Sequence, residues 1–353
     1  MKLDDLVHEV SEWLKGSGPD PDIVISSRVR LARNIQSSPF VHWANRRKGK
    51  SILSKLEEAV GAIPHMKSAL FLRIDELTET DKQFLLERHL ISHEHAQGGG
   101  FRGVAISDRE VISIMLNEED HLRIQVLQSG FNLSEAWRLA SSVDRELEQR
   151  LELAYSPSWG YLTACPTNTG TGLRASVMVH LPCLMMTKQI GKVLQALNKL
   201  SLAARGLFGE GTEAAGNFFQ FSNQVTLGQS EEDIIDNLER VIRQIIDHEK
   251  EARKVLLGQN KEKLFDQIWR SYGTLRNSYI INSQETINLM SLVRLGVDMG
   301  IVSNIDRKVV NELFILTQPA HLQKLEGKDL TPQERDVKRA ELIRGKLNHE
   351  GRK

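Results

Sequence analysis

Two arginines, Arg28 and Arg30, are separated by one residue, Val29, in residues 26–30, a segment that alternates as a β-strand does. In a strand, both guanidinium groups would point to the same face, where they repel each other unless an anion lies between them. One interpretation is a solvated strand face. The other is a polyphosphate site, because the planar fork of arginine matches phosphate oxygens.

Three consecutive carboxylates, Glu118, Glu119 and Asp120, lie between two apolar runs. Neighbouring like charges repel one another, so they do not stabilise a fold by themselves. An acidic turn is one explanation. The alternative is a functional region, because Arg123 follows in the next expected strand and brings acid and base together.

A glycine-containing loop at residues 165–176 holds Gly170 and Gly172 between threonines, after Cys165 and before Arg174. The backbone of such a loop could approach a phosphate closely. It is not a Walker A loop, because it lacks GKS or GKT and a strand follows in place of a helix. Cys165 could equally be a buried small apolar residue, the commoner fate of a free cysteine.

A second loop, residues 205–216, contains four glycines, with Arg205 at its base and Glu210 in its middle. A flexible linker is one interpretation. The embedded arginine and glutamate favour an active-site lid.

Histidines gather in residues 88–95, where His89 and His93 have the spacing of one helix face. The string is not HExxH and no further ligand is obvious, so surface or packing histidines are favoured over a zinc site. The sequence predicts no metal held by protein side chains alone.

Short apolar runs rich in β-branched residues predict strands at 22–33, 110–116, 121–128 and 174–182. Helical spacing predicts helices at 54–63, 134–151 and 187–204. Several strands follow one another without helices long enough for repeated crossovers. We therefore expect an α+β fold with an antiparallel sheet.

Beyond Gly228 the pattern becomes helical, starting with residues 230–258, where Ser230 and Asp233 give a capping signal. The last helix is announced by Thr331 as cap and Pro332 at the first position. We place a boundary near residue 255. The expected parts are an N-terminal helical segment (1–20), an α+β domain (21–255) and an all-helical C-terminal domain (256–353).

The balanced charge, 46 Lys plus Arg against 46 Asp plus Glu, argues against a protein held to nucleic acid by bulk charge. The two cysteines, Cys165 and Cys183, form no CxxC pair, which fits a reducing compartment. No signal-peptide block and no bilayer-spanning apolar run is evident. We expect a cytoplasmic protein without membrane or direct nucleic-acid partners.

Four motifs occur in the order SSRVR, NEEDHLR, CPTNTGTGLR and RGLFGEGTE. Together they resemble the catalytic domain of the phosphagen (guanidino) kinases, the group of creatine and arginine kinases. The resemblance implies a curved antiparallel sheet flanked by helices, with ATP lying across it.

The order of regions differs from that of the small-guanidine kinases, in which a helical domain precedes the SSRVR strand. Here the helical domain follows, and it contains RDVKRA at residues 335–340. This arrangement resembles the bacterial protein arginine kinases, in which an open site admits an arginine on a protein surface. It implies an ATP-dependent kinase of protein arginine that phosphoarginine activates and whose product marks proteins for Clp-type degradation under stress.

By this resemblance, Glu119 and Glu210 are the catalytic carboxylates and Cys165 lies beside the guanidinium. The residues implied in ATP binding are Ser26, Ser27, Arg28, Val29, Arg30, His89, Arg123, Arg174, Ala175, Ser176, Val177, Met178, Arg205, Gly206, Leu207, Phe208, Gly209 and Glu210. The residues implied in binding phosphoarginine are Arg335, Asp336, Arg339 and Ala340.

The implied reaction explains the acidic run. A guanidinium stays protonated at physiological pH and is a poor nucleophile, but carboxylates can orient it and accept its departing proton. ATP and Mg²⁺ are the implied cofactors, and the arginines would neutralise the triphosphate. Glu118 and Asp120 would tune the local field or hold Mg²⁺ through water.

The resemblance also implies partners: proteins bearing arginine, among them a heat-shock transcription repressor, a zinc-binding activator protein, a Clp chaperone–protease and a second copy of the chain. The residues also admit two other functions. A kinase of free arginine is disfavoured because no N-terminal domain closes the site. A non-catalytic phosphoarginine adaptor is disfavoured because both carboxylates and all five arginines are present.

Overall fold

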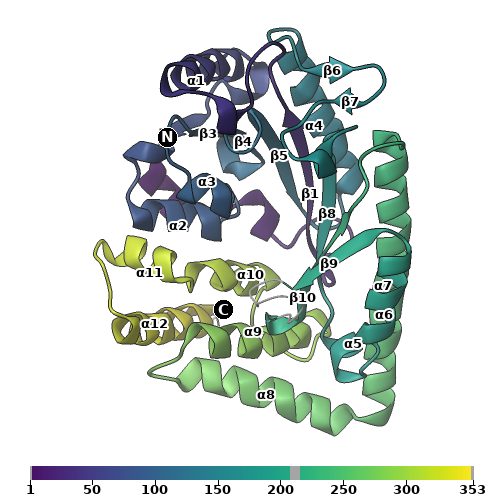
Figure 1. Ribbon diagram of the computed structural model, residues 1–353. Coiled ribbons are helices and arrows are strands. Elements are labelled where there is room, and N and C mark those ends of the chain that lie inside the picture. Colours follow the sequence, from purple (N-terminus) through teal and green to yellow (C-terminus); the bar gives the residue numbers. More distant parts are fainter. Residues whose placement is uncertain (1, 207–214, 351–353) are drawn as a thin grey trace.

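The computed structural model describes residues 2–206 and 215–350, and its centre is an eight-stranded sheet (Figure 1). The strand order is β2-β3-β4-β5-β1-β8-β10-β9, and every pairing is antiparallel, which confirms the expected α+β class. The strands are β1 Val24–Arg33, β2 Leu70–Arg73, β3 Gly103–Ile106, β4 Ile112–Leu116, β5 Leu122–Ser129, β8 Leu173–His180, β9 Leu202–Gly206 and β10 Phe218–Asn223. A separate ribbon pairs β6 Tyr155–Ser156 with β7 Gly160–Tyr161.

Helices α4 and α7 pack against one face of the sheet (Figure 1). The helices before the C-terminal region are α1 Arg46–Gly61, α2 Glu79–Glu87, α3 His93–Gln97, α4 Leu133–Glu148, α5 Pro182–Met186, α6 Ile190–Lys199 and α7 Glu231–Gln259. Those of the C-terminal region are α8 Lys261–Asn277, α9 Ser283–Asp298, α10 Arg307–Leu316, α11 Pro319–Glu326 and α12 Pro332–Glu350. In the part of the chain that the structure describes, no helix has the length and apolarity needed to cross a membrane.

The strand register sorts the side chains of the central strands onto two faces. Arg30 lies opposite Arg174, and Ala32, two residues further on, lies opposite Arg123. Residues opposite each other, and residues two apart in one strand, share a face of a sheet. Met178, four residues after Arg174, lies opposite Gln220, and Gln220 lies opposite Arg205. All five arginines of the motifs therefore share one face of the sheet.

The opposite face carries the core. Val29, Leu31, Ala175 and Val177 are fully buried on it and belong to the main hydrophobic cluster. The alternation of arginine and apolar residues in β1 and β8 thus reflects a sheet that is covered by helices on one side and lines a cleft on the other.

The predicted helix signals of the C-terminal half are confirmed. Ser230 and Asp233 form a reciprocal capping box at the start of α7, and Thr331 exchanges hydrogen bonds with Glu334 at the start of α12. Helix α7 continues through residue 255, so the boundary that we placed there falls inside a helix. Helices α8–α12 lie below the sheet in Figure 1, where α9 packs near the start of β10 and α11 packs against α2.

Two local predictions were wrong. The helix expected over 187–204 ends at Lys199, and Leu202–Gly206 is the edge strand β9, paired with β10. Ser201 has a φ of 56°, which breaks the helix, and pairing with β10 overrides the helical preference of the leucines and alanines. His89 and His93 do not share a helix, because α2 ends at Glu87 and His89 has a φ of 60°.

Candidate active site

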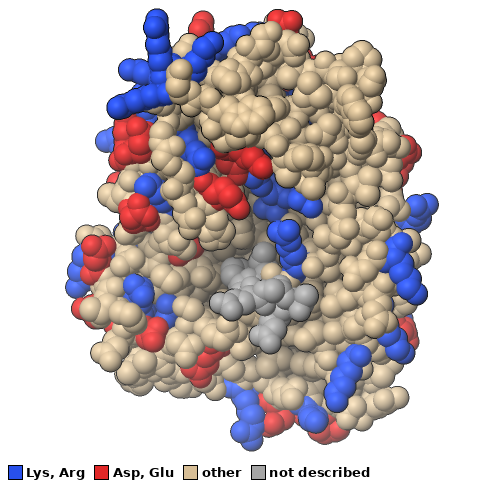
Figure 2. All heavy atoms as spheres, in the orientation of Figure 1, with Lys and Arg blue, Asp and Glu red and all other residues tan. Residues whose placement is uncertain are grey.

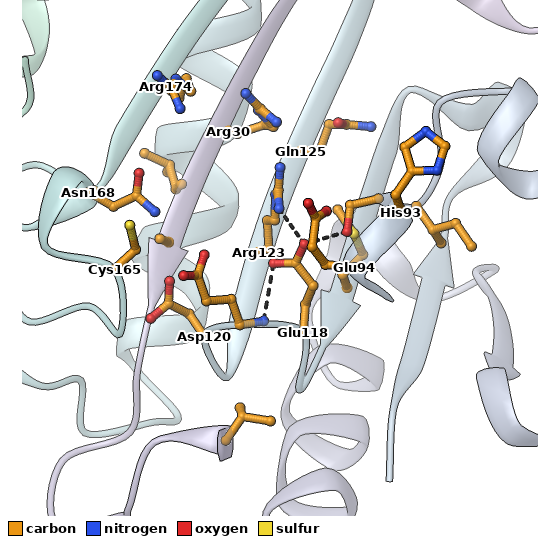
Figure 3. A pocket seen from close by; sticks show the side chains of 18 of the residues that line it. Arg30, His93, Glu94, Glu118, Asp120, Arg123, Gln125, Cys165, Asn168 and Arg174 are labelled. Atoms are coloured by element: carbon orange, nitrogen blue, oxygen red, sulfur yellow. Dashed lines mark hydrogen bonds and ion pairs between the residues drawn. The ribbon is translucent and has the colours of Figure 1, made fainter. Parts of the chain in front are cut away.

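A cleft of about 930 Å³ opens on the arginine-bearing face of the sheet. Its lining comes from β1, β5, β8 and β9, from the turn between β4 and β5, and from the loop around Cys165. Figure 2 shows the cleft as a hollow with acidic side chains on one side and basic side chains on the other. In the close view, Arg30 and Arg174 lie toward one end, whereas Glu118, Asp120 and Cys165 lie toward the other (Figure 3).

The cationic end gathers the five arginines predicted to bind phosphate: Arg28, Arg30, Arg123, Arg174 and Arg205. Burial, and then the neighbouring arginines, lower the pKa of Arg28 to about 10 and lower the pKa of Arg30 as well. Within the described residues, Arg123 alone of the five forms an ion pair, with Glu118. The four others form an uncompensated cationic surface, which a polyanion would stabilise.

Two buried nitrogens at this end have no hydrogen-bond partner in the described part of the chain: Nε of Arg30 and Nε2 of His89. Burial and the nearby Arg28 lower the pKa of His89 to about 3, so its imidazole is neutral at physiological pH. Unpaired buried donors are costly and usually mark an absent ligand or water. These atoms, together with the arginines, fit the phosphates of a nucleotide.

Two of the three carboxylates of the acidic turn are held by contacts within the protein, and the third faces the open cleft. Glu118 is buried, pairs with Arg123 and accepts hydrogen bonds from the hydroxyl of Ser92 and the backbone N–H of Glu119 at 3.2 Å (Figure 3). Asp120 is also buried, and its Oδ1 accepts from the amide of Asn34 and from the backbone N–H of Ala164, both at 2.6 Å. Both carboxylates are therefore held in place by the protein.

Glu119 differs from its neighbours because its side chain is exposed to the cleft. Within the described residues its carboxylate accepts no hydrogen bond and forms no ion pair. Burial, and then the charges of Asp120 and Glu118, raise its pKa above the ordinary value for glutamate. A free carboxylate of raised pKa is a better proton acceptor than an ordinary one.

Asp120 also fixes the position of Cys165. The hydrogen bond from Ala164 ties the loop that carries the cysteine to the acidic turn, and Asn34 bridges the two by donating to Asp120 and to the carbonyl of Leu162. Cys165 is half-buried in the cleft lining, with its Sγ 3.0 Å from Oγ1 of Thr167. The thiol and Glu119 thus belong to one locally braced unit.

The other residues predicted to bind ATP that the structure describes do not line the cleft with their side chains. Val29, Ala175 and Val177 point into the core on the other face, and Ser27 is buried and donates to the carbonyl of Gly130. Ser26, Ser176 and Met178 lie on the face of the arginines but are buried, and Oγ of Ser176 accepts a hydrogen bond from Nε of Arg28 at 3.3 Å. Gly206 ends β9. Leu207, Phe208, Gly209 and Glu210 lie outside the described residues.

The loop glycines Gly170 and Gly172 both have positive φ. A Cβ on Gly170 would lie 2.2 Å from the carbonyl oxygen of Thr226, and one on Gly172 would lie 2.7 Å from that of Ala32. The protein's own backbone lies too close to these two positions for a side chain, so glycine is required there. The sequence had suggested close approach to a phosphate instead.

Several lining residues were missed by the sequence analysis: Val41, His42, Ser92, Glu94, Arg102, Gln125 and Asn168. All of them except Gln125 come from loops, short helices or helix ends, where spacing carries no periodic signal. Gln125 was the one accessible case, because it lies two residues after Arg123 in the same strand.

No group of three or more His, Cys, Asp or Glu side chains in the described part of the chain is arranged to hold a metal ion. Mg²⁺ in kinases is held chiefly by substrate phosphates with one or two carboxylates. Glu118 and Asp120, which line the cleft beside the arginines, fit that mode of binding.

The predicted phosphoarginine motif lies at the start of α12. Arg339 is almost fully buried and donates to the carbonyls of Thr317 at 2.8 Å and Ile281 at 2.9 Å, and it pairs with Asp336 at 2.5 Å. Arg335 is half-buried and donates to the carbonyl of Leu330. Arg339 therefore has a structural role that the sequence analysis did not foresee.

The chain matches two family descriptions. Residues 51–252 match "ATP:guanido phosphotransferase, C-terminal catalytic domain", and residues 261–353 match "Protein-arginine kinase McsB C-terminal domain". The chain is 49% identical to the protein-arginine kinase of Halothermothrix orenii over 99% of this chain and 100% of that protein. It is 50% identical to the protein-arginine kinase of Moorella thermoacetica over 95% and 96% of the two chains.

Solved structures give the same picture of the fold. A lombricine kinase structure superposes with a TM-score of 0.58 at 25% identity and covers 70% of each chain. A substrate-free duplicated taurocyamine kinase from Schistosoma mansoni superposes with a TM-score of 0.58 at 22% identity and covers 75% of this chain and 42% of that one.

Proposed function

The chain belongs to the ATP:guanido phosphotransferase family, in its protein-arginine kinase branch, and from this we propose that it transfers the γ-phosphoryl group of Mg-ATP to arginine side chains of proteins. The guanidino nitrogen forms a bond to phosphorus, the bond between phosphorus and the bridging oxygen of ADP breaks, and the nitrogen gives up a proton. The products are ADP and protein phosphoarginine.

The observation that carries this proposal is the division of one cleft between cations and a free carboxylate. The arginines match an anionic donor, and Glu119 matches a cationic acceptor. A carboxylate in this position can pair with both edges of a guanidinium and accept its proton, which fits an arginine acceptor.

At the donor end, Arg28, Arg30, Arg174 and Arg205 would neutralise the triphosphate and hold the γ-phosphoryl group in line with the attacking nitrogen. Mg²⁺, when bound, neutralises developing charge between the phosphates. Arg123 would contribute to the same neutralisation while it remains paired with Glu118. Catalysis would then rest on positioning and electrostatics, without a covalent enzyme intermediate.

At the acceptor end, Glu119 would orient the guanidinium and accept its proton as the nitrogen attacks. Glu210, which lies outside the described residues, is proposed as the second carboxylate from the sequence motif alone. Cys165 would lie beside the bound guanidinium as a polarizable neighbour.

The proposal is tested by incubating the protein with Mg-ATP and a protein acceptor and mapping acid-labile, alkali-stable phosphate on arginine by mass spectrometry. Glu119→Gln should lower kcat by about 10²–10⁴-fold while ATP affinity by calorimetry stays within about two-fold. Glu135→Gln, at an exposed position on α4, is the matched control and should retain activity.

Undiminished protein phosphorylation by Glu119→Gln would exclude this role for Glu119. Phosphorylation of free arginine with no modification of proteins would replace the proposal with a small-guanidine kinase.

The proposal extends to regulation and partners. Phosphoarginine would bind at Arg335, Asp336, Arg339 and Ala340 and activate the enzyme, and the modified proteins, among them a transcription repressor, would pass to a Clp chaperone–protease. A zinc-binding activator protein and a homodimer belong to the same proposal. Its support is the resemblance of residues 261–353 to the C-terminal domain of protein-arginine kinases.

A further inference from the structure

Three aromatic side chains gather at the mouth of the cleft, in the segment between β1 and α1. The ring of Trp43 lies 4.8 Å from His42 and 5.8 Å from Phe40, measured between ring centroids, and His42 stacks on Phe40 at 6.1 Å. The Trp43 side chain is 72% exposed. An exposed tryptophan of this degree contributes little to folding and is typical of a binding surface.

The aromatic segment is anchored to the acidic turn. His121, two residues after Glu119, accepts a hydrogen bond on Nδ1 from the backbone N–H of Ile35 and donates from Nε2 to the carbonyl of Pro39, each at 3.0 Å. One imidazole thus fixes both ends of residues 35–39 against the catalytic turn. The aromatic residues that follow Pro39 are therefore held in a set position relative to Glu119.

The segment also reaches the acceptor end of the cleft directly. Val41 and His42 line the same cavity as Glu119 and Cys165. Residues that flank an arginine bound at Glu119 would therefore meet His42 at the cleft lining, with Phe40 and Trp43 next to it. This continuity with the cleft identifies the acceptor chain as the occupant of the surface.

Charge agrees with that occupant. Beyond Trp43, the first turns of α1 carry Arg46, Arg47, Lys48 and Lys50, all exposed and visible as a basic group over α1 (Figure 2). An acceptor segment crossing this region would be favoured by acidic residues and opposed by further basic ones.

We propose that Phe40, His42 and Trp43 form a docking platform that selects acceptor segments with a large apolar or aromatic residue beside the target arginine. The proposal rests on the proposed function, because it concerns the acceptor of that reaction.

The test uses the full chain and two synthetic peptides, each with one arginine, in which the neighbouring residue is tryptophan or alanine. Phosphoarginine is measured by mass spectrometry, and kcat/KM is compared. We expect the tryptophan peptide to be preferred by about three- to ten-fold, the range of one aromatic contact. Trp43→Ala should bring the preference close to one, and Trp43→Phe should restore most of it.

Trp269→Ala is the matched control, because Trp269 is also exposed but lies on α8. It should keep the full preference. A preference that survives Trp43→Ala, or equal rates for both peptides with the unmodified chain, would overturn the platform while leaving the kinase intact. Absence of phosphoarginine on every peptide and protein acceptor would overturn the proposed function and the platform with it.

Discussion

Three adjacent carboxylates in one turn have three different environments, and this is why an acidic run that repels itself can exist. Glu118 is neutralised by Arg123, whereas Asp120 is held by hydrogen bonds from Asn34 and Ala164 although burial raises its pKa. Glu119, between them, is left without a partner in the described structure and carries the raised pKa. The two structural carboxylates thus create the electrostatic field in which the third would act as a base.

Removing the charge of Asp120 tests this field. Asp120→Asn keeps an oxygen that accepts from Asn34 and Ala164 but removes a charge that raises the pKa of Glu119. The pKa of Glu119 should then fall. Because the carboxylate form accepts the proton, the acid limb of the kcat/KM profile should move to lower pH, as measured between pH 5 and 8.

The acceptor role of Asp120 is separated from its charge by Asp120→Ala, which removes both hydrogen bonds. The loop around Cys165 should loosen, and alkylation of Cys165 by iodoacetamide should become several-fold faster, whereas Asp120→Asn leaves that rate unchanged. An unmoved acid limb in Asp120→Asn would show that Glu119 does not depend on this charge. Equal alkylation rates in all three proteins would show that Asp120 does not hold the loop.

At the scale of elements, periodicity predicted the parts of the site that lie within strands. The alternation in residues 26–30 placed Arg28 and Arg30 correctly on one face. It did not predict β9, because the residues that make it a strand are its hydrogen-bonding partners in β10, which the local sequence does not contain. For the same reason the place of His42 in the same cleft as Glu119 was not predictable from spacing, because the contact of His121 with Pro39 joins segments far apart in the sequence.

In helix α12, one residue, Arg339, has a structural role and also belongs to the proposed phosphoarginine site. Arg339 joins α12 to the start of α9 and the end of α10 through the carbonyls of Ile281 and Thr317. Arg339→Ala should destabilise the protein by about 3 kcal/mol, since it leaves buried acceptors unpaired. Arg335→Ala, at a half-buried position, should change stability by less than about 1 kcal/mol. Urea unfolding measures both.

This difference decides how phosphoarginine binding is tested. Loss of binding in Arg339→Ala would combine a missing contact with a loosened helix. Calorimetric titration of a phosphoarginine peptide against Arg335→Ala isolates the contact. Unchanged affinity in that variant would remove Arg335 from the proposed site, and equal stability of the two variants would contradict the structural role of Arg339.

Helix α11 depends on a carboxylate from another element. Glu87, at the end of α2, accepts from the backbone N–H groups of Ala320 and His321 and from Nδ1 of His321, at 2.8–3.0 Å. It thus caps α11 from outside, next to the cleft residue His89. Glu87→Ala should cost about 1–2 kcal/mol and selectively speed hydrogen exchange at the first amides of α11. Glu79→Ala, on the exposed side of α2, should change neither the stability nor the exchange at these amides. If the first amides of α11 exchange equally fast in both variants, the cap is contradicted.

At the scale of the whole molecule, the C-terminal helices and the sheet are joined by buried polar contacts as well as by apolar packing. Arg294 of α9 is fully buried and donates to the carbonyls of Pro21 at 2.8 Å and Asp22 at 3.3 Å, just before β1. It also contacts His180 at the end of β8 and pairs with Asp298. The strands that carry the cleft arginines are therefore tied at their ends to the helical region.

The strength of this joint is tested by comparing two arginines. Arg294→Ala leaves the buried carbonyl of Pro21 without its donor and removes one of the two ion pairs of Asp298, so the free energy of unfolding should fall by about 3–5 kcal/mol. Because Pro21 and Asp22 precede β1, the dissociation constant for ATP should rise as well. Arg270→Ala removes an exposed pair with Asp266 on α8 and should cost about 0.5 kcal/mol or less, with ATP binding unchanged. If urea unfolding gives the same free energy for both variants, the two regions are held together by apolar packing alone, and the buried arginine has no part in joining them.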